Sequence, residues 1–571
     1  PALCAIFLKP HEEGHKKKNL LQRFYTAFNT AFETTTLKYR KSVSFLSGRK
    51  WIAVLGIAVF AGIFYILIQS TPTGFVPNED MGTVMSDISL PPGASMERTD
   101  QVTQEIAKAA QAIPEIENIL RITGRGMLSG TGSNYGMVIM RLKNWSERTG
   151  KGQDVQAIIG KMFAKTGGIR DAKVIFFAPP TIQGFGATGG FEFQLQDKSG
   201  GDIGRFGKIS SDFLAALNQR PEIQFASTSF NPNFPQYQID VNVARAKEAG
   251  LSVTDILGTM QGYYGGVYAS NFNQFGKQYR VIYQAEPSFR ANPEGMNNIY
   301  VRNSSGTMAP ISEFVSLNRV YGPQAISRFN LFTSIGINGS PKPGFSSGDA
   351  IRAVREVAAK TLPAGYGYEF SGITREEISA GGQTVFIFVL VLLFVYFLLS
   401  AQYESYILPF AVLLSLPVGL AGAFIFAWLF GVNNNIYLQI TLIMLVGLLA
   451  KNAILIVEFA VERRRRGMPL VQAALEGAQA RLRPILMTSF AFILGLVPLM
   501  LSSGAGATGN RSIGTGAVGG MLIGTVFGVF VIPVLFIIFQ SLQERISPLK
   551  IEPIFEEDGV GAEAQIVRTA H

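Results

Sequence analysis

Six stretches of about 20 mostly apolar residues constrain the fold of this chain more than any other feature. A helix needs roughly 20 such residues to cross the hydrocarbon core of a bilayer. The stretches are residues 51–69, 384–401, 407–430, 436–460, 484–502 and 513–540. Hydrophobic residues make up 47% of the chain and charged residues only 16%, which is typical of a membrane protein with a sizeable soluble part. We therefore predict a bundle of six membrane-spanning helices.

The basic residues indicate how these helices are oriented. Lysine and arginine gather in residues 1–50, in the 461–483 loop and in the tail at 541–571. Cytoplasmic segments of membrane proteins carry such an excess, and six crossings place all three segments on one side. We therefore expect all three to be cytoplasmic. The same bias explains the net charge of +10, so no nucleic-acid partner is expected.

Residues 1–50 are predicted to hold the end of a preceding span and then a cytoplasmic linker helix. The start, P-A-L-C-A-I-F-L-K-P, has no initiator methionine, and we expect an earlier portion of the protein to precede it. Its one cysteine, Cys4, is the only cysteine of the chain, which excludes an internal disulfide. Apolar side chains then recur at helical spacing and predict an amphipathic helix on membrane lipid: Leu20, Leu21, Phe24, Phe28 and Phe32.

Residues 70–383 form one long insertion on the side opposite to the basic segments. Strand-like runs, such as Val174 to Phe177 and Tyr279 to Tyr283, alternate with helix-like runs, such as Glu97 to Ile113. Glycine, proline and asparagine separate these runs. Such an order is typical of α+β folds of the split βαβ type. We predict two or three subdomains here, followed by five spanning helices in residues 384–540.

A lysine in the fourth span is the strongest candidate for a functional side chain. At 1.5 Å per residue, Lys451 lies about 18 Å from Arg463 at the cytoplasmic edge and about 24 Å from Asn435 at the other edge. A lysine near the bilayer midplane costs roughly 2.5–3.5 kcal/mol and usually marks a path for ions or protons. Its side chain is too short to reach either interface.

The six spans offer this lysine no adequate acidic partner. They contain no aspartate, and their one glutamate, Glu458, lies about 10 Å from Lys451 along the helix axis, near the cytoplasmic edge. We therefore expect the acid to come from another segment, either a missing part of the protein or another subunit. Arg481 and Arg483 begin the next span and Thr488 follows, but for the arginines anchoring at the interface competes with a functional role.

Glycines recur at four-residue spacing in the last span. Gly516, Gly520, Gly524 and Gly528 share one helix face. A ridge of this kind lets another helix approach closely. We predict tight helix packing along it, with a sliding contact as the alternative.

Longer motifs resemble one family of transporters. The runs G-L-L-A-K-N-A-I-L-I-V-E-F at 447–459 and R-L-R-P-I-L-M-T-S-F-A-F-I-L-G-L-V-P-L at 481–499 resemble the resistance-nodulation-division (RND) transporters, in particular the acriflavine-resistance pumps of the hydrophobe/amphiphile efflux branch. Shorter matches are F-V-P-N-E-D-M-G at 75–82, S-L-P-P-G-A-S at 89–95, F-E-F-Q-L at 191–195 and G-T-G-A-V-G-G-M at 514–521. The resemblance runs in order from residue 1 to about 540 and matches the second half of such a pump.

The resemblance implies a function for the whole protein. Pumps of this family are proton-driven antiporters of the bacterial inner membrane that export drugs, dyes and detergents, with the proton gradient as energy source and no cofactor. They work as homotrimers with a periplasmic adaptor and an outer-membrane channel. This chain would supply spans seven to twelve, periplasmic porter subdomains and a docking insert at about 233–322. Alone, such a half is not expected to pump.

The family also implies a proton relay. Lys451 matches its intramembrane lysine, and Arg481 and Thr488 match polar partners in the next-to-last span. Asn452 is predicted to support the lysine as a neighbouring polar group. The acidic partners, a pair of aspartates, belong to the fourth span of the other half. Protonation of that pair would release Lys451 and bias the packing of the helices.

The drug pocket of the family maps onto the periplasmic insertion. One pocket strand matches residues 191–195, whose alternate side chains share a face, and residues 124–135 match a loop that gates between pockets. That loop is poorer in phenylalanine than in the family, which leaves the substrate range open. The predicted substrate-binding residues are Met85, Met127, Tyr135, Met140, Phe191, Phe193 and Leu195. Ordinary core packing is the alternative for each of them.

Two other functions remain alternatives. His11-Glu12-Glu13-Gly14-His15 fits H-E-x-x-H, the zinc motif of metalloproteases, although a glycine within the motif, three lysines after it and its position in a basic segment outside the membrane oppose that function. Heavy-metal exporters of the same superfamily use methionine relays. The methionines of the spans are scattered over three helices, which favours packing: Met444, Met487, Met500 and Met521.

Overall fold

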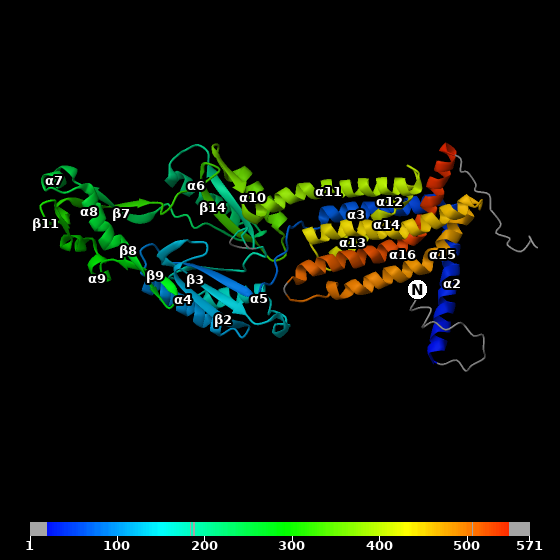
Figure 1. The fold of residues 1–571 in the computed structure, drawn as a ribbon, viewed down its shortest axis with the longest axis horizontal. Helices are drawn as coiled ribbons and strands as arrows, with labels where there is room; N and C mark the ends of the chain where they lie inside the picture. The colour runs from blue at the N-terminus through cyan, green and yellow to red at the C-terminus, as the bar shows by residue number, and fades with distance from the viewer. Residues whose placement is uncertain (1–19, 183, 187–188, 505, 548–571) are drawn as a thin grey trace, which may run out of the picture.

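The computed structural model describes residues 20–182, 184–186, 189–504 and 506–547. Within them, six helices are long and apolar enough to cross a membrane by length and composition. Figure 1 shows these helices packed side by side in one half of the molecule. They are α3 (Lys50–Ser70), α11 (Gly372–Tyr403), the consecutive α12 (Pro409–Leu413) and α13 (Leu416–Leu429), α14 (Ile436–Arg465), α15 (Leu470–Met500) and α16 (Ala507–Ile546). Each overlaps one of the six apolar stretches.

Two of these helices begin well before the apolar stretch that predicts them. Helix α11 begins at Gly372, so the segment 372–383 is helical and continuous with the bundle. Helix α15 begins at Leu470 and runs through Pro484. Its first turns are too polar to be detected as a span, but small residues let them pack closely on α14. A Cβ atom on Gly477 would lie only 2.9 Å from the backbone nitrogen of Ala460.

Glycines of α13 and α16 bring the backbones of these two helices together. A Cβ atom on Gly422 would lie 2.6 Å from the carbonyl oxygen of Gly519, and one on Gly520 would lie 3.1 Å from that of Gly419. The sequence prediction of a glycine ridge on α16 is therefore confirmed at Gly520. The contribution of Gly419, Gly422 and Gly519 was not predicted.

The other predicted ridge positions divide into two kinds. Gly516 faces side chains of α14, where a Cβ atom would lie 2.6 Å from Leu438. Gly524 meets both Leu449 of α14 and the backbone of α13, where a Cβ atom would lie 3.1 Å from the Cα atom of Gly419. Gly528 meets only Ile532 of its own helix, at 3.7 Å, so a packing role at that position was wrong. Helix α16 is thus held on two sides by its glycines, but only over the part of the ridge that ends at Gly524.

Substitution at these glycines should show the difference. Gly519→Ala places a methyl group 2.7 Å from the carbonyl oxygen of Gly422, and neither backbone can move away without separating the helices. We expect a loss of about 1–3 kcal/mol, the usual effect of overpacking, seen as a lower thermal unfolding midpoint in detergent. Gly528→Ala is the matched control on the same helix and should leave the midpoint unchanged. Equal midpoints for the two variants would contradict close packing at Gly519.

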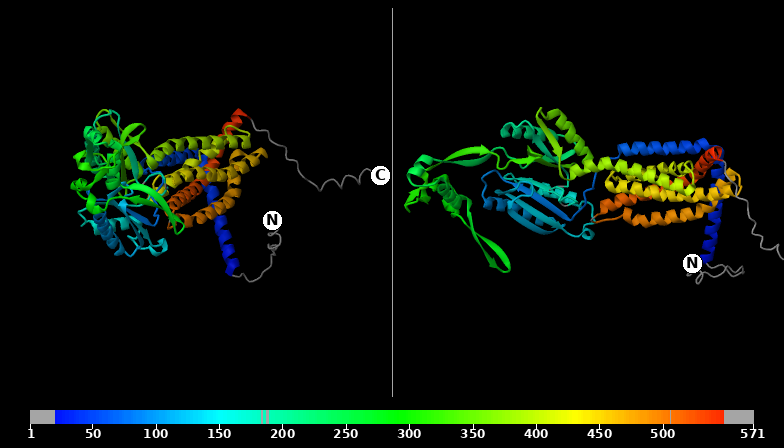
Figure 2. Two further views of the ribbon diagram at one scale, coloured as in Figure 1. Left: turned by 60° about the vertical axis from the view of Figure 1, so that its left-hand side comes forward. Right: turned by 45° about the horizontal axis from the view of Figure 1, so that its top comes forward.

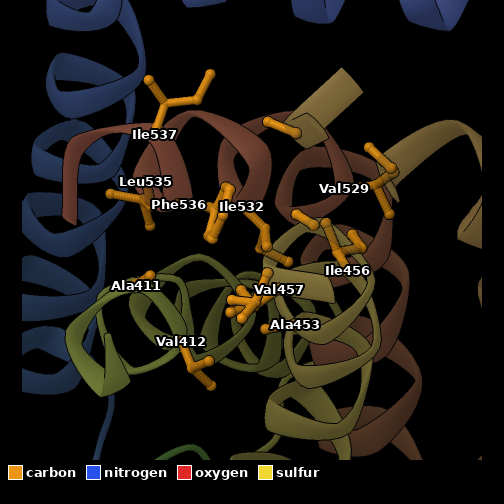
Figure 3. Close-up of a cluster of buried hydrophobic side chains, with 14 of the residues drawn as sticks. Ala411, Val412, Ala453, Ile456, Val457, Val529, Ile532, Leu535, Phe536 and Ile537 are labelled. Carbon is orange, nitrogen blue, oxygen red and sulfur yellow. The ribbon is translucent and has the colours of Figure 1, made fainter. Parts of the chain in front are cut away.

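A buried hydrophobic cluster joins the bundle to the first described helix, α2 (Leu20–Gly48). Figure 3 shows the part of it contributed by α12, α14 and α16, with Ala411, Val412, Ala453, Ile456, Val457, Val529, Ile532, Leu535, Phe536 and Ile537 labelled. Helix α2 lies across the end of the bundle (Figure 1), and the hydroxyl of Tyr39 donates to the carbonyl of Val529 at 3.0 Å. On its predicted amphipathic face, Phe28 is exposed and Phe32 packs against the cluster. The side chains of Leu20, Leu21 and Phe24 lie outside what the structure describes.

The soluble half contains a first subdomain with a four-stranded antiparallel sheet in the order β2-β3-β1-β4. Helices α4 and α5 cover one face of this sheet and share a hydrophobic core with it. The elements follow the chain as β1 (Thr83–Ser89), α4 (Met96–Gln111), β2 (Ile116–Arg125), β3 (Thr131–Leu142), η1 (Trp145–Glu147), α5 (Val155–Thr166) and β4 (Lys173–Phe177). This βαββαβ order is the split βαβ type.

The second subdomain has a similar order of strands and helices, but its sheet has five strands. Strands β13, β14, β5 and β15 are neighbours in that order, and β6 also pairs with β14. Helices α6 and α10 pack on one face of the sheet. The elements are β5 (Phe191–Asp197), α6 (Ile203–Asn218), β6 (Ile223–Ser227), β13 (Ser327–Phe329), β14 (Phe332–Pro341), α10 (Ser347–Thr361) and β15 (Tyr366–Phe370).

An insert lies between β6 and β13 of the second subdomain, at the end of the molecule farthest from the helices (Figure 1). Its two long strands, β7 (Phe234–Val241) and β12 (Val315–Gly322), pair along their whole length. The other elements are α7 (Val243–Glu248), α8 (Val253–Met260), η2 (Gln261–Gly265), β8 (Val267–Gln274), β9 (Lys277–Tyr283), α9 (Pro287–Arg290), η3 (Pro293–Asn298), β10 (Tyr300–Arg302), β11 (Met308–Pro310) and η4 (Ile311–Glu313). The β8–β9 hairpin stands away from the rest of the insert (Figure 2, right), and nearly all of its residues are exposed.

Candidate functional site

Lys451 lies in the middle of α14 and its side chain is exposed. Among the residues that the structure describes, it has neither a hydrogen bond nor an ion pair. Other exposed residues of α14 recur on the same face at intervals of seven and four residues, namely Ile440, Gly447 and Glu458. The opposite face of α14 is buried against α13, α15 and α16. The lysine thus stands on an open stripe that runs along the length of the helix.

The predicted neighbour, Asn452, points away from this stripe. It is 5% exposed, and its side-chain nitrogen donates to the hydroxyl of Ser489 in α15 at 3.1 Å. The short connection between α14 and α15 makes them antiparallel. When two antiparallel helices contact each other through one residue of each, the residues just before those two contact residues both point to the same side of the helix pair. Lys451 and Thr488 therefore lie on one side of the helix pair, although Asn452 does not contact the lysine.

The two remaining polar side chains of the predicted relay have local partners. The hydroxyl of Thr488 donates to the carbonyl oxygen of Ile485 at 3.1 Å, within its own helix. The guanidinium of Arg481 lies over the ring of Phe459 in α14, with its central carbon 3.4 Å from the ring centroid. Phe459 is eight residues, or about 12 Å, from Lys451 along α14. The structure thus places Lys451 and Thr488 on one face and does not bring Arg481 to the lysine.

Two partners in this region were not predicted from the sequence. Ser489 is 1% exposed and holds Asn452, and Phe459 lies under Arg481. A polar residue in an apolar span was a usable signal for Ser489, since it directly follows Thr488. Phe459 gave no such signal, because an apolar side chain in a spanning helix is ordinary.

Glu79 links the helical half to the soluble half. It lies in the connection between α3 and β1 and is 5% exposed. Its carboxylate accepts hydrogen bonds from the backbone N–H groups of Thr508, at 3.1 Å, and Gly509, at 2.7 Å, in the first turn of α16. These groups have no partner within the helix, and the helix dipole also favours a negative charge there. The backbone N–H of Glu79 donates to Thr181, between β4 and β5, so one residue joins three segments.

The side chains predicted to line a drug pocket divide between the two faces of the sheets. Phe191, Phe193 and Leu195 do share one face of β5, but it is the face covered by α6 and α10, where they are at most 1% exposed. Met140 is fully buried in the core of the first subdomain. Core packing accounts for these four side chains in this conformation. A pocket-lining role for them stays a prediction.

Met85, Met127 and Tyr135 lie where a ligand could reach them. Met85 is on the face of β1 opposite to the core, and Met127 is 44% exposed in the turn between β2 and β3. Tyr135 is 6% exposed and donates its hydroxyl to Gln324 at 3.2 Å. It lines a cavity of about 160 Å³ between the two subdomains. The other lining residues are Asp87, Ser89, Leu90, Pro92, Leu128, Ser129, Asn134, Lys173, Ile175, Ser227, Thr228, Ser229, Phe230, Asn231 and Asn338.

A bundle of six apolar helices with a lysine on its open face, joined to two split βαβ subdomains, is the architecture of a multi-pass membrane protein with a large soluble part. The chain belongs to the AcrB/AcrD/AcrF family, which matches residues 1–540. Its members are RND membrane transporters and not enzymes.

Curated relatives match nearly all of the chain. The multidrug resistance protein MdtF of Escherichia coli K12 is 37% identical over 557 residues, which is 95% of this chain and 52% of MdtF. The toluene efflux pump membrane transporter TtgB of Pseudomonas putida is 37% identical over 96% of this chain and 52% of TtgB. The solvent-resistant pump membrane transporter SrpB, also of Pseudomonas putida, is 36% identical over 97% of this chain and 53% of SrpB. The chain spans about half the length of the curated relatives it matches.

Proposed function

We propose that this chain is part of a proton-driven pump that exports hydrophobic or amphiphilic compounds such as drugs, dyes and detergents. The names of the relatives support efflux, since they describe a toluene efflux pump, a solvent-resistant pump and a multidrug resistance protein. The observation that carries proton coupling is the exposed Lys451 on the open stripe of α14, which has no partner among the described residues. A charge at that depth in a membrane needs an acid from another segment.

In this proposal the open stripe of α14 is covered by a further segment that carries a pair of aspartates. While these are ionised, Lys451 pairs with them. When protons neutralise them, the attraction weakens and the lysine moves away, which changes how α14 packs against the added segment. Asn452 stays fixed on Ser489 and keeps α14 and α15 together during the change.

The change in helix packing reaches the soluble half through the first turn of α16. Glu79 ties the first turn of α16 to the connections before β1 and before β5, so a shift of α16 also shifts the first subdomain. The cavity between the two subdomains then changes shape. This gives a physical route from protonation in the membrane to binding and release in the bacterial periplasm.

The proposal includes partners outside this chain. We propose an inner-membrane homotrimer that works with a periplasmic adaptor and an outer-membrane channel. The insert, at the far end from the helices, has a β8–β9 hairpin with aromatic side chains that are exposed on both of its faces. A two-stranded hairpin is only marginally stable alone in water, and exposed apolar surface of this kind often marks a contact with another protein.

The metal-exporter and metalloprotease alternatives gain no support. Met444, Met487 and Met521 lie on three different helices, with Met487 64% exposed and Met521 packed in a hydrophobic cluster. They do not line one path. The His11–His15 motif lies outside the described residues and stays untested.

Complementation tests the proposed function. In a bacterial strain that lacks its own drug pumps, the complete transporter that contains this chain should restore resistance to dyes, detergents and solvents and should lower the accumulation of a fluorescent dye. Collapse of the proton gradient with an ionophore should abolish the effect. Resistance to copper or silver without resistance to organic compounds would contradict the proposal.

A further inference from the structure

Asp87 is a buried carboxylate without an ion pair in the described part of the chain. It is 3% exposed, although it lies on the face of β1 that is not covered by helices. Val84 and Ile88 point from β1 into the core beneath α4 and α5, whereas Asp87 points toward the cavity between the two subdomains. Something other than the core must therefore cover it.

The turn between β2 and β3, residues 126–130, covers this carboxylate. The backbone N–H groups of Leu128, at 2.8 Å, and Ser129, at 3.4 Å, donate to Oδ1 of Asp87. The hydroxyl of Ser129 donates to Oδ2. Hydrogen bonds to an ionised acceptor are about twice as strong as those between neutral groups. One carboxylate thus holds the tip of the turn at two neighbouring residues.

The turn has a shape that fits this contact. A Cβ atom on Gly126 would lie 2.7 Å from Oδ1 of Asp87, so a larger residue there would push the turn away from the carboxylate. The N–H of Gly126 donates to the carbonyl of Gly130 at 2.8 Å and closes the turn. Gly130 has a φ of +94°, a conformation that favours glycine. The turn is therefore built to lie over Asp87.

The closed turn limits the space between the subdomains. The cavity of about 160 Å³ is bounded on one side by Asp87, Leu128 and Ser129 and on the other by Thr228 and Asn338 of the second subdomain. Sites for drug-sized ligands usually measure about 300–1,000 Å³. With the turn in this position, the cavity holds only a small ligand.

We propose that Asp87 is a positioning residue that holds the 126–130 turn across the cavity and thereby sets the size of compound that the cavity admits. The contact between Asp87 and the turn does not depend on transport, whereas its effect on the size of the exported compound rests on the proposed efflux function. A small polar compound fits under the closed turn. A larger amphiphile enters only when the turn lifts off Asp87 and its hydrogen bonds are given up.

Chemical labelling of the turn tests the contact without any need for transport. A cysteine is placed at Leu128, and its reaction with N-ethylmaleimide in the complete transporter is followed by mass spectrometry of the peptide that contains it. Asp87→Asn and Ser129→Ala each weaken the attachment, the second without a change in the buried strand. Loss of a hydrogen bond to a charged group predicts a rise in labelling rate of about tenfold for each variant.

A control cysteine at Leu120, which is 56% exposed on β2 of the same subdomain, should label at the same rate in all variants. An unchanged rate at position 128 in both variants would overturn the proposal. An equal rise at positions 128 and 120 would also overturn it, because the subdomain as a whole would then have loosened.

Transport measurements separate the two proposals. Ser129→Ala should improve the export of large amphiphilic dyes relative to small compounds, at equal expression. If the cysteine at 128 becomes more reactive but the complete transporter exports nothing, the attachment stands and the efflux function falls. If export is normal but its size preference and the labelling rate do not change, the efflux function stands and the role of Asp87 falls.

Discussion

The Lys451→Ala variant of the complete transporter is expected to lose drug efflux entirely, while its expression, membrane insertion and assembly stay normal. The physical reason is the size of the charge interaction. Two opposite charges about 4 Å apart attract each other by about 4 kcal/mol at an effective dielectric constant of 20. A change of that size shifts a two-state equilibrium about a thousandfold. In the proposed relay, a protein without this lysine has no charge for the acid to attract, so protonation of the acid would no longer alter how α14 packs.

The measurement is dye efflux from cells, with susceptibility to detergents as a second readout. Ile440→Ala is the matched control, because Ile440 is 53% exposed on the same stripe of α14 but carries no charge. It should leave efflux near the wild-type rate. Lys451→Arg keeps the charge and should retain part of the activity. Normal efflux by Lys451→Ala would exclude a relay role for this residue.

The membrane helices could be predicted from the sequence because their signal is local. Twenty apolar residues in succession identify a span without reference to the rest of the chain. The helix ends were harder, since α11 and α15 continue into polar segments outside the apolar stretches. The polar part of α15 packs on α14 through the close fit of Gly477 on Ala460, and no pattern in the sequence near Gly477 predicts that contact.

The same limit applies to the two faces of a strand. Alternation predicts that Phe191, Phe193 and Leu195 share a face of β5, but it does not show whether that face is covered by helices or open to a pocket. The answer depends on α6 and α10, which cover one side of the sheet and enclose these side chains. A phenylalanine that lines a pocket and one that fills a core look alike in a sequence, so the choice needed the positions of both helices.

The polar contacts that join distant segments were the least predictable. Glu79 meets the first turn of α16, and Asp87 meets the 126–130 turn. Each acidic residue lies far from its partner along the chain, and no periodic pattern in the sequence relates the two positions. Both residues lie in or beside motifs that resemble the family, at 75–82 and 89–95, but such a motif does not show which distant backbone groups a carboxylate binds.

The Arg148→Ala variant is expected to destabilise the first subdomain strongly. The Arg148 side chain is 1% exposed and binds both carboxylate oxygens of Asp80, at 3.0 and 3.1 Å. It also donates to the carbonyl groups of Lys143 and Gln153. Removal of one member of a buried pair leaves the other charge without compensation and typically costs about 3–5 kcal/mol. Arg98→Ala is the control, because the pair of Arg98 with Asp171 is exposed and such pairs contribute about 0–1 kcal/mol.

Trp145 lies beside this ion pair, since its indole N–H donates to the backbone carbonyl of Asp80 at 2.9 Å. Trp51 and Trp428 also fluoresce, so every variant carries Trp51→Phe and Trp428→Phe. Urea unfolding followed by the fluorescence of Trp145 should give a lower midpoint for Arg148→Ala and a nearly unchanged midpoint for Arg98→Ala.

The difference in stability between the wild type and Arg148→Ala should also depend on pH. Burial alone raises the pKa of Asp80, but hydrogen bonds from Arg148, Gly82 and Val155 outweigh burial and hold the pKa below its usual value. A lowered carboxylate pKa contributes stability that is present above the unfolded-state pKa of about 4 and is lost as the pH falls through the folded-state pKa. The advantage of the wild type over Arg148→Ala should therefore be full at neutral pH and shrink below about pH 4. A difference that stays constant from neutral pH into that acid range would show that Arg148 stabilises the subdomain by packing and not by its charge.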